Sequence, residues 1–470
     1  MITSRGLDRG GLGARVGVRS AVALAIATGL VAAGAATALA AGSLTQVSRD
    51  PYTNNTSFHR TEVEPDTFAF GKTVVATFQV GRFSDGGASN IGWATSTDSG
   101  STWKHGYLPK TTVYAQPAGP WARISDPSVA YDAAHATWII ATLAIDNNVG
   151  GAAVITSRST DGGHTWVAPT TVNAAGSFQD KSWIACDNTA ASPYYGRCYT
   201  EWDDAGVGGE LRMAWSDNGA ATWHQATTPS SSVIGGQPVA QANGHVIVPI
   251  LLQSGTIGSF KSTDGGATYS GPTVVAAVTD HVVAGNLREE TLPSAEVDGA
   301  GTVYVAWPDC RFRASCSSND IVYSKSTNGT TWSAVARVPI DARTSTVDHF
   351  IPGIGVDRAT SGPSAHIAVS YYFYPKASCT ASTCRLKVGQ TTSTDGGAHW
   401  SSPQTLSGAM SLTGLPLTNL GYMVGDYIST SWVSGRAVTV FAQTNGTTCS
   451  ISAADCTVRM VSPTVGPIAG

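Results

Sequence analysis

Residues Ser159–Trp166 have the sequence STDGGHTW, and close copies of this segment recur along the chain. Ser and Asp side chains in such a segment bond nearby backbone amides, and glycine adopts dihedral angles that other residues avoid. The closing aromatic residue can pack between neighbouring sheets. The other copies are Ser96–Trp103 (STDSGSTW), Ser262–Tyr269 (STDGGATY), Ser393–Trp400 (STDGGAHW), Ser216–Trp223 (SDNGAATW) and Ser326–Trp332 (STNGTTW). We therefore expect one tight turn to be repeated in several structural units.

A second pattern lies between these turns and marks the start of each unit. Asp126–Asp132 (DPSVAYD) is its clearest form, and the chain repeats it with changes. The related segments begin at Glu64-Pro65, Lys181-Ser182, Gln237-Pro238, Leu292-Pro293, Ile351-Pro352 and Val424-Gly425. Successive copies are 55 to 73 residues apart, which fits one four-stranded sheet with its loops.

Most units contain four segments with the composition of short β-strands. In the fifth unit these are Leu292–Val297, Thr302–Trp307, Asp320–Ser326 and Trp332–Val338. The seventh unit has Asp426–Trp432, Arg436–Gln443 and Thr457–Pro463, and we expect Leu44–Arg49 to supply its fourth strand. Pairing the two chain ends closes the ring and removes exposed strand edges. The sequence thus predicts an all-β fold, a seven-bladed β-propeller of four-stranded antiparallel blades closed by the N-terminal strand.

The repeated turn resembles the Asp-box, or bacterial neuraminidase repeat, of propellers in the sialidase superfamily. The six copies extend this resemblance from Ser96 to Trp400. The resemblance implies that each box joins the third and fourth strands of a blade, on the face away from the active site. Sialidases themselves have six blades, so a six-bladed ring with the chain from Tyr422 onward as an appendage is the alternative.

The N-terminal residues have the features of a secretory signal. Four arginines precede an apolar run that starts at Ala21, and Ala38–Ala40 offers a small-residue cleavage site. We expect residues 1–40 to be a signal peptide and residues 41–470 to form a single sialidase-like β-propeller domain, secreted to the extracellular space. An uncleaved anchor is the alternative, because the run nearly reaches membrane-spanning length.

Eight cysteines follow the signal segment as near neighbours, which in an exported chain predicts disulfides. The expected pairs are Cys186/Cys198, Cys310/Cys316, Cys379/Cys384 and Cys449/Cys456. No C-x-x-C motif occurs, so a zinc site is disfavoured. We expect no cofactor and no catalytic metal, although a structural calcium ion in an acidic channel stays open.

The charge of the chain limits the classes of molecule that it can bind. Charged residues make up 13% of it and the formal net charge is −4, which excludes the basic footprint of a nucleic-acid binder. The expected partner is an extracellular glycan or polysaccharide. We expect it to be bound by a monomer that has no membrane contact once the signal is removed.

The second pattern also indicates where a site can form. The first strand of each blade lines the channel of a propeller, so the starts of these strands converge. The position before the proline holds the polar residues Glu64, Asp126, Lys181 and Gln237 in four of the units. A position two residues earlier adds Glu62, Gln179, Glu290, His349 and Tyr422. A packed barrel would hold apolar residues here, so we expect a ligand site, with a water-filled channel mouth as the alternative.

The residue types at this face suit glycan chemistry. Hydrolysis of a glycosidic bond usually needs two carboxyl groups, and sialidases use a tyrosine nucleophile helped by a glutamate. The catalytic candidates are Asp126, Glu64, Glu290, Asp426 and Tyr427, where Gly425–Ser429 resembles the strand that carries the sialidase tyrosine. Asp126 is the best single candidate, with Arg123 nearby to tune it. The substrate-binding candidates are Arg82, Arg123, Lys181, Gln237, Arg288, Arg311, His349, Trp202 and Trp307.

These observations together predict a secreted glycoside hydrolase that acts on extracellular glycans as a sialidase-like exo-glycosidase. Two alternatives stay open. A non-catalytic propeller that binds glycans or proteins needs only the polar face. A polysaccharide lyase needs a base and a neutralising cation, for which His349, Tyr422 and Arg288 are available.

Overall fold

The computed structural model describes residues 43–176, 178–451 and 456–463, so the predicted signal peptide lies outside the described residues. Within this part the chain forms 31 β-strands and four single-turn 3-10 helices, and no α-helix. None of its described helices is long and apolar enough to cross a membrane. The fold is an all-β propeller built mainly from four-stranded antiparallel sheets, as the repeats predicted.

The N-terminal sheet has eight strands. They are β2 (Glu62–Phe70), β3 (Thr73–Arg82), β4 (Ala88–Ser96), β5 (Lys104–Tyr107), β6 (Arg123–Asp132), β7 (Thr137–Ile145), β8 (Gly151–Ser159) and β9 (Thr170–Asn173). Its two halves are joined through a single residue pair, Ala88 of β4 with Ile124 of β6. Each half is otherwise a four-stranded antiparallel sheet.

Four further sheets follow in chain order. Three of them have four strands: β10 (Gln179–Cys186), β11 (Cys198–Asp204), β12 (Glu210–Ser216), β13 (His224–Gln225); β19 (Ser294–Val297), β20 (Val303–Asp309), β21 (Asp320–Ser326), β22 (Ala336–Arg337); and β23 (Asp348–Val356), β24 (Ile367–Tyr374), β25 (Lys387–Ser393), β26 (Gln404–Thr405). The fourth, between the first two of these, has β14 (Val233–Ile234), β15 (Val239–Ala240), β16 (Val246–Leu252), β17 (Thr256–Ser262) and β18 (Ser270–Ala277).

The last four-stranded sheet combines both ends of the described chain. Its order is β1 (Leu44–Gln46), β31 (Arg459–Pro463), β30 (Arg436–Gln443) and β29 (Ser429–Val433). The antiparallel pairing of β1 with β31 agrees with the strand expected from the sequence. A hairpin of β27 (Leu417–Thr418) and β28 (Gly421–Tyr422) precedes this sheet. The 3-10 helices are Ala205–Val207, Ala314–Cys316, Gly362–Ser364 and Leu412–Gly414.

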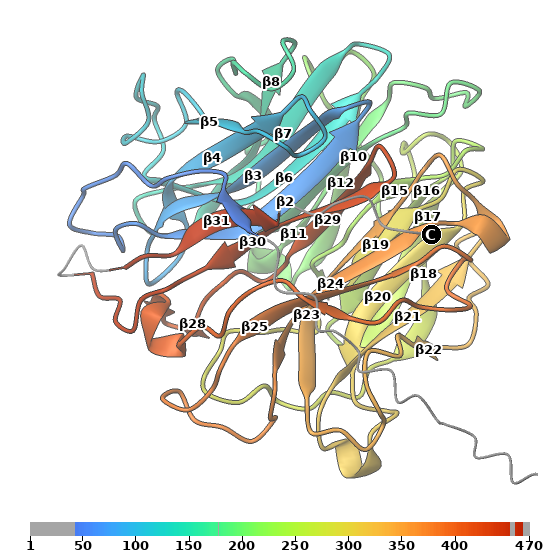
Figure 1. The fold of residues 1–470 in the computed structure, drawn as a ribbon. Helices are drawn as coiled ribbons and strands as arrows, with labels where there is room; N and C mark the ends of the chain where they lie inside the picture. Colours follow the sequence, from blue (N-terminus) through green and yellow to red (C-terminus); the bar gives the residue numbers. More distant parts are fainter. Residues whose placement is uncertain (1–42, 177, 452–455, 464–470) are drawn as a thin grey trace, which may run out of the picture. The chain divides into compact units, whose positions relative to one another are not determined.

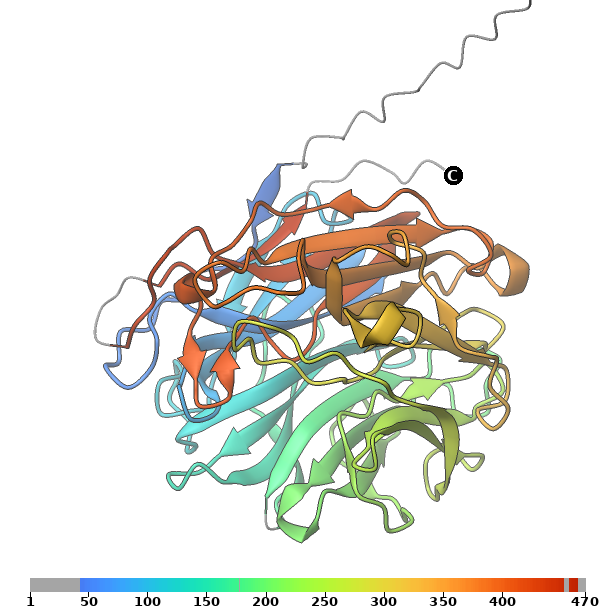
Figure 2. The ribbon, with the colours of Figure 1, turned by 90° about the horizontal axis from the view of Figure 1, so that it is seen from below.

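The first strands of the sheets contact one another in sequence. The order is β2, β6, β10, β15, β19, β23 and β29, and β29 contacts β2 again. Figures 1 and 2 show the sheets following each other in chain colour, with the blue and red strands side by side. The N-terminal and C-terminal strands therefore meet.

Side chains of neighbouring sheets satisfy the inner strand edges, whose amides lack a ladder partner. Asp66 Oδ2 accepts a hydrogen bond from Val129 N at 2.7 Å. Ser294 Oγ accepts one from the amide of Ile354 at 3.1 Å. Residues next to the repeated proline position thus link each sheet to its neighbour.

The repeated turns carry the hydrogen bonds expected from their sequence. In Ser159–Trp166, between β8 and β9, Asp161 accepts bonds from Ser159 Oγ at 2.7 Å and from the Thr165 hydroxyl at 2.6 Å. The Trp166 indole N–H donates to Gly163 O at 3.1 Å. The other five copies likewise lie between the last two strands of a sheet, or of one half of the eight-stranded sheet.

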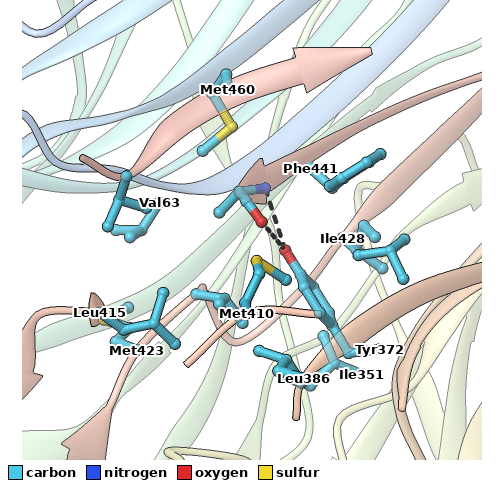
Figure 3. Packing of buried hydrophobic residues seen from close by; sticks show 14 of the residues in the cluster. Val63, Ile351, Tyr372, Leu386, Met410, Leu415, Met423, Ile428, Phe441 and Met460 are labelled. Carbon is cyan, nitrogen blue, oxygen red and sulfur yellow. Dashed lines mark hydrogen bonds between the residues drawn. The ribbon is translucent and has the colours of Figure 1, made fainter. Parts of the chain in front are cut away.

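Hydrophobic packing and disulfides hold the sheets and loops of the described residues together. The largest buried cluster joins the sheets near the two chain ends, and in Figure 3 the Tyr372 hydroxyl bonds both N and O of Ala442, each at 3.1 Å. The four predicted disulfides all form: Cys186–Cys198, Cys310–Cys316, Cys379–Cys384 and Cys449–Cys456. They fit a protein of an oxidising, extracellular environment.

Candidate functional site

Charged side chains from distant parts of the chain meet at the starts of the first strands. We call this group the central cluster, and it consists of Glu64, Asp126, Lys181, Arg288 and Asp426. The first three are the polar residues that the repeated pattern placed together. These three residues and Asp426 are at most 7% exposed, whereas Arg288 is partly exposed. The convergence predicted from the repeat is therefore present.

A β-bulge in the first strand of each of these three units sets the direction of the Glu64, Asp126 and Lys181 side chains. Glu64, Asp126 and Lys181 have positive φ angles of 56°, 46° and 47°, and strand pairing is interrupted at each of them. Such angles are uncommon for residues other than glycine, and a residue before proline normally avoids helical space. The same strained conformation recurs in a fourth unit, where Ile351 has a φ of 47° at a similar interruption of strand pairing. Strain of this kind concentrates at functional sites, since the fold must compensate for it.

Two cations hold Asp426. The Arg288 guanidinium donates to both carboxylate oxygens, with 2.7 Å between Nε and Oδ1. Lys181 Nζ bonds Oδ2 of Asp426 and lies 3.6 Å from Oδ1 of Asp126. Burial raises the pKa of Asp426, but Arg288 and Lys181 outweigh it and hold this pKa well below its usual range. Asp426 is thus a permanent anion at the centre of the cluster.

Glu64 has the opposite character. Its Oε2 accepts a hydrogen bond from Gln79 Nε2, and its Oε1 accepts one from Asp426 N at 3.3 Å. Arg82 fixes the amide of Gln79 by donating to its Oε1 at 2.9 Å. Burial, followed by the negative charges of Asp426 and Asp126, raises the pKa of Glu64 to about 8, against the pull of Lys181 and Arg288. Glu64 therefore carries a proton at neutral pH.

A cavity of about 210 Å³ opens directly on these groups. Glu64, Asp126 and Arg288 line it together with Arg82 and Asp180. Oδ1 of Asp126 accepts no hydrogen bond from the described residues, although Lys181 faces it. Burial and the charge of Asp126 raise the pKa of Asp180 to about 6. The cavity thus presents a protonated carboxyl group, further carboxyl groups and two guanidinium groups.

Two apolar side chains at this cavity are exposed to solvent. Phe178 and Leu420 line it and are 37% and 63% exposed. Leu420 lies at the tip of the β27–β28 hairpin, which is anchored on one side by Asn419 N donating to Ser84 O at 2.8 Å. The other side of the hairpin is anchored by Arg288 N, which donates to Tyr422 O at 2.8 Å.

Tyr427 and Gln237 lie beneath the central cluster. Both line a void of about 20 Å³ together with Asp126, Lys181 and Asp426. The Tyr427 hydroxyl donates to Pro127 O at 3.1 Å, and burial raises the pKa of Tyr427 well above its ordinary value. Such a phenol resists ionisation, so this geometry does not favour Tyr427 as a nucleophile.

Several predicted residues lie elsewhere. Arg123 binds Asp85 instead of Asp126 and stacks on Phe83, with its guanidinium carbon 4.1 Å from the ring centre. Arg311 binds Asp309, with 2.9 Å between Nε and Oδ1. Each arginine is neutralised by a carboxylate close in sequence or on the adjacent loop, and neither joins the central cluster through a contact among the described residues.

The two predicted tryptophans are core residues. Trp202 and Trp307 are 1% and 0% exposed and belong to separate hydrophobic clusters. The indole N–H of Trp307 donates to Asp309 Oδ2 at 3.1 Å. Their rings have no free face for a sugar, because the positions that end these strands point into the sheet packing. Glu290 is half-buried, and its Oε2 has no hydrogen-bond partner among the described residues.

His349 belongs to a different charged group. It is 1% exposed, and its Nε2 lies 3.9 Å from Asp341 Oδ2. Burial lowers the pKa of His349 to about 4, so the ring is neutral at pH 7. With Asp320 the three residues hold their ligand atoms within 4.8 Å of one another. Arg313 and Arg337 each bind both carboxylates, so cationic side chains already neutralise this group and a metal ion is disfavoured.

Two residues of the site were not predicted from any sequence pattern. Gln79 lies inside β3 and touches Glu64 only because the bulge turns that side chain toward it. Asp180 lies one residue before the repeated position and lines the cavity from β10. A spacing pattern identifies only positions that repeat, so it does not identify residues that a single unit supplies.

Comparisons with known proteins agree with the fold. No protein-family profile matches the chain, and no curated protein matches its sequence. Among solved structures, an ulvan lyase of a new polysaccharide lyase family is similar with a TM-score of 0.50 and 10% identity over 89% of this chain and 95% of that one. At this identity the likeness shows the fold alone.

Sialidase structures are also similar, at lower scores. The intramolecular trans-sialidase from Ruminococcus gnavus has a TM-score of 0.48 and 13% identity over 72% of this chain and 94% of that one. A Hadza microbial sialidase has a TM-score of 0.46 and 16% identity over 66% of this chain. The match spans 63% of the length of that sialidase.

Proposed function

We propose that this protein is a glycoside hydrolase acting on extracellular glycans, with Glu64 as the general acid. One observation carries the proposal: Glu64, with its pKa raised to about 8, lines the same cavity as the carboxyl group of Asp126. Glycosidases need one protonated and one ionised carboxyl group on either side of the scissile bond, and different environments create that difference.

The remaining residues of the site support this division of roles. Glu64 donates its proton to the glycosidic oxygen as the bond from that oxygen to the anomeric carbon breaks, while Asp126 either attacks this carbon as nucleophile or takes a proton from the water that attacks it. Lys181, 3.6 Å from Asp126 Oδ1, stabilises the carboxylate, and Asp426 keeps Lys181 and Arg288 in place. The negative charges of Asp426 and Asp126 keep the proton on Glu64 between turnovers.

The size of the cavity favours exo-action, as in the sialidase-like exo-glycosidase expected from the sequence. Its volume of about 210 Å³ is smaller than pockets for drug-sized ligands, which begin at about 300 Å³. One terminal sugar ring suits such a space. Arg82 and Arg288 line it and can bond the hydroxyl or acidic groups of that sugar.

We also propose a seven-bladed ring, in which the eight-stranded sheet counts as two blades. The single residue pair that joins its halves, Ala88 with Ile124, supports this division. The cyclic order of contacts among the seven first strands supports it as well. Secretion after removal of residues 1–40, a single propeller domain over residues 41–470 and a monomeric state belong to the same proposal.

Product analysis by mass spectrometry tests the function. The protein is incubated with a broad glycan panel that includes sialosides, beside the variants Glu64→Gln and Asp126→Asn. Glu210→Gln serves as a matched control, because Glu210 lies on the surface and pairs with Arg212. We expect products that have gained water, lost in both site variants and kept in the control.

Other results would contradict the proposal. Unsaturated products would indicate a lyase, and binding without any product would indicate a recognition propeller. Full activity of Glu64→Gln with water-containing products would place the general acid elsewhere.

A further inference from the structure

A larger cavity lies at the opposite ends of the first strands. The strand β2 starts near the central cluster at Glu62 and ends at Phe70, and Phe70 lines this second cavity. The ends of β23 and β29 contribute Val356–Ala359 and Thr430–Gly435. Its volume of about 570 Å³ falls within the range of small-molecule sites, about 300 to 1,000 Å³. We call it the distal cavity.

Aromatic rings line the distal cavity and are held by internal contacts. Phe70 is 42% exposed, and its ring centre lies 4.4 Å from that of Tyr131. The half-buried Trp432 donates its indole N–H to Gly355 O at 2.9 Å, so its polar edge is already satisfied. The rings are thus fixed in orientation before any ligand arrives, which lowers the entropy lost on binding.

Polar contacts hold the charged groups of the distal cavity. Arg358 Nη2 lies 3.2 Å from Glu296 Oε2, and the two side chains are 30% and 24% exposed. The Asp298 carboxylate accepts three backbone N–H groups at 2.8 to 3.0 Å. Asp357 accepts a backbone N–H at 3.0 Å and faces His366. Among the described residues, an anion would meet three carboxylates, those of Glu296, Asp298 and Asp357, against the single guanidinium of Arg358, which disfavours acidic ligands, whereas Arg358 and Glu296 still offer hydrogen bonds.

We propose that the distal cavity is a second, non-catalytic binding site for neutral saccharide chains. A sugar ring has an apolar C–H face that stacks on aromatic rings and hydroxyl groups that hydrogen-bond to polar side chains. Phe70 and Trp432 supply the stacking surfaces, and Arg358 with Glu296 supplies donors and acceptors. The site does not depend on catalysis at the central cluster.

The two cavities are separate sites. The axial region between them contains voids of only about 20 Å³ and 30 Å³. Gln237 and Trp183 line both voids, and Phe68 is shared by the second void and the distal cavity. Each void has room for one or two water molecules but not for a sugar ring. Binding at the distal cavity is therefore distinguishable from binding at the catalytic cavity.

Isothermal titration calorimetry on the Glu64→Gln protein tests the proposal without turnover. The probes are the neutral oligosaccharides maltohexaose, cellohexaose and xylohexaose, with hexagalacturonate as the charged comparison. We expect at least one neutral probe to bind, and Phe70→Ala or Trp432→Ala to weaken its affinity about tenfold or more. Phe178→Ala is the matched control, because this aromatic residue is 37% exposed at the other cavity and its loss leaves the affinity unchanged.

Three results would overturn the inference. The first is that no neutral probe binds at millimolar concentration. The second is that binding survives both Phe70→Ala and Trp432→Ala but is lost in Phe178→Ala, which places the probe in the catalytic cavity. The third is that hexagalacturonate binds more tightly than the neutral probes and loses its affinity in Arg358→Gln. Since Phe70 is largely exposed, its variant tests the site even if Trp432→Ala does not fold.

Discussion

Replacing Glu64 by glutamine is expected to abolish activity and yet stabilise the protein at neutral pH. The pKa of Glu64 is raised from 4.5 to about 8 in the folded protein. As the pH rises, the unfolded chain therefore loses this proton first. The contribution of Glu64 to stability is complete below pH 4.5 and is lost as the pH rises through about 8.

The size of the stability effect follows from the difference between the pKa of Glu64 in the unfolded chain, 4.5, and in the folded protein, about 8. Each pH unit is worth about 1.4 kcal/mol, so ionisation of the unfolded chain costs the native state about 3 kcal/mol at pH 7. Glutamine removes this cost, but its amide cannot accept both bonds that Gln79 and Asp426 N donate to Glu64. One lost hydrogen bond costs about 1 kcal/mol. We expect Glu64→Gln to be about 2 kcal/mol more stable than the wild type at pH 7 and about 1 kcal/mol less stable near pH 4.

Urea denaturation of both proteins across this pH range measures the difference. Shifts of buried carboxyl groups that do not interact with Glu64 are shared by both proteins and cancel. The surface variant Glu210→Gln is the control, and its difference from the wild type should stay flat with pH. If Glu64→Gln is equally destabilised at acid and neutral pH, Glu64 is not held protonated and cannot be the general acid.

Three further variants test other parts of the structure. Asp161→Ala removes the acceptor of several hydrogen bonds in a repeated turn and should lower the free energy of unfolding in urea by about 2 kcal/mol, with activity kept. Because these bonds lower the pKa of Asp161, its contribution to stability is lost as the pH falls. The free energies of unfolding of the variant and the wild type should therefore differ least in acid. Trp307→Ala should cost about 3 to 5 kcal/mol in the same assay, since the ring is fully buried, and a loss of sugar affinity without destabilisation would contradict its place in the core. Replacing Cys186 and Cys198 by serine opens a 12-residue span and should cost about 3 kcal/mol, measured as a lower Tm, and this difference between variant and wild type should disappear when both proteins are reduced beforehand.

Local physical chemistry made the fold predictable from the sequence. The repeated turn depends on hydrogen bonds within eight residues, so its copies identify the same structure wherever they occur. The strands Asp320–Ser326 and Arg436–Gln443 have the bounds expected from the sequence. The cysteine pairs, separated by 5 to 12 residues, are equally local.

The site was predictable where it repeats. Glu64, Asp126 and Lys181 occupy one position of the pattern, and propeller topology brings this position of the first three units together. The expected disulfide framework and the closing strand β1 followed from the same kind of argument.

The repeat could not predict where an individual side chain points or which residue it contacts. Trp202 and Trp307 end strands at the predicted face, yet sheet packing buries them, while Arg123 pairs with Asp85. Asp426 meets Lys181 and Arg288 across 245 and 138 residues, a contact that no local pattern encodes. The sequence by itself therefore determined the repeating fold, because turns and strands depend on near neighbours. Only the tertiary structure decided which carboxyl group keeps its proton, because burial and charge depend on residues that folding brings together.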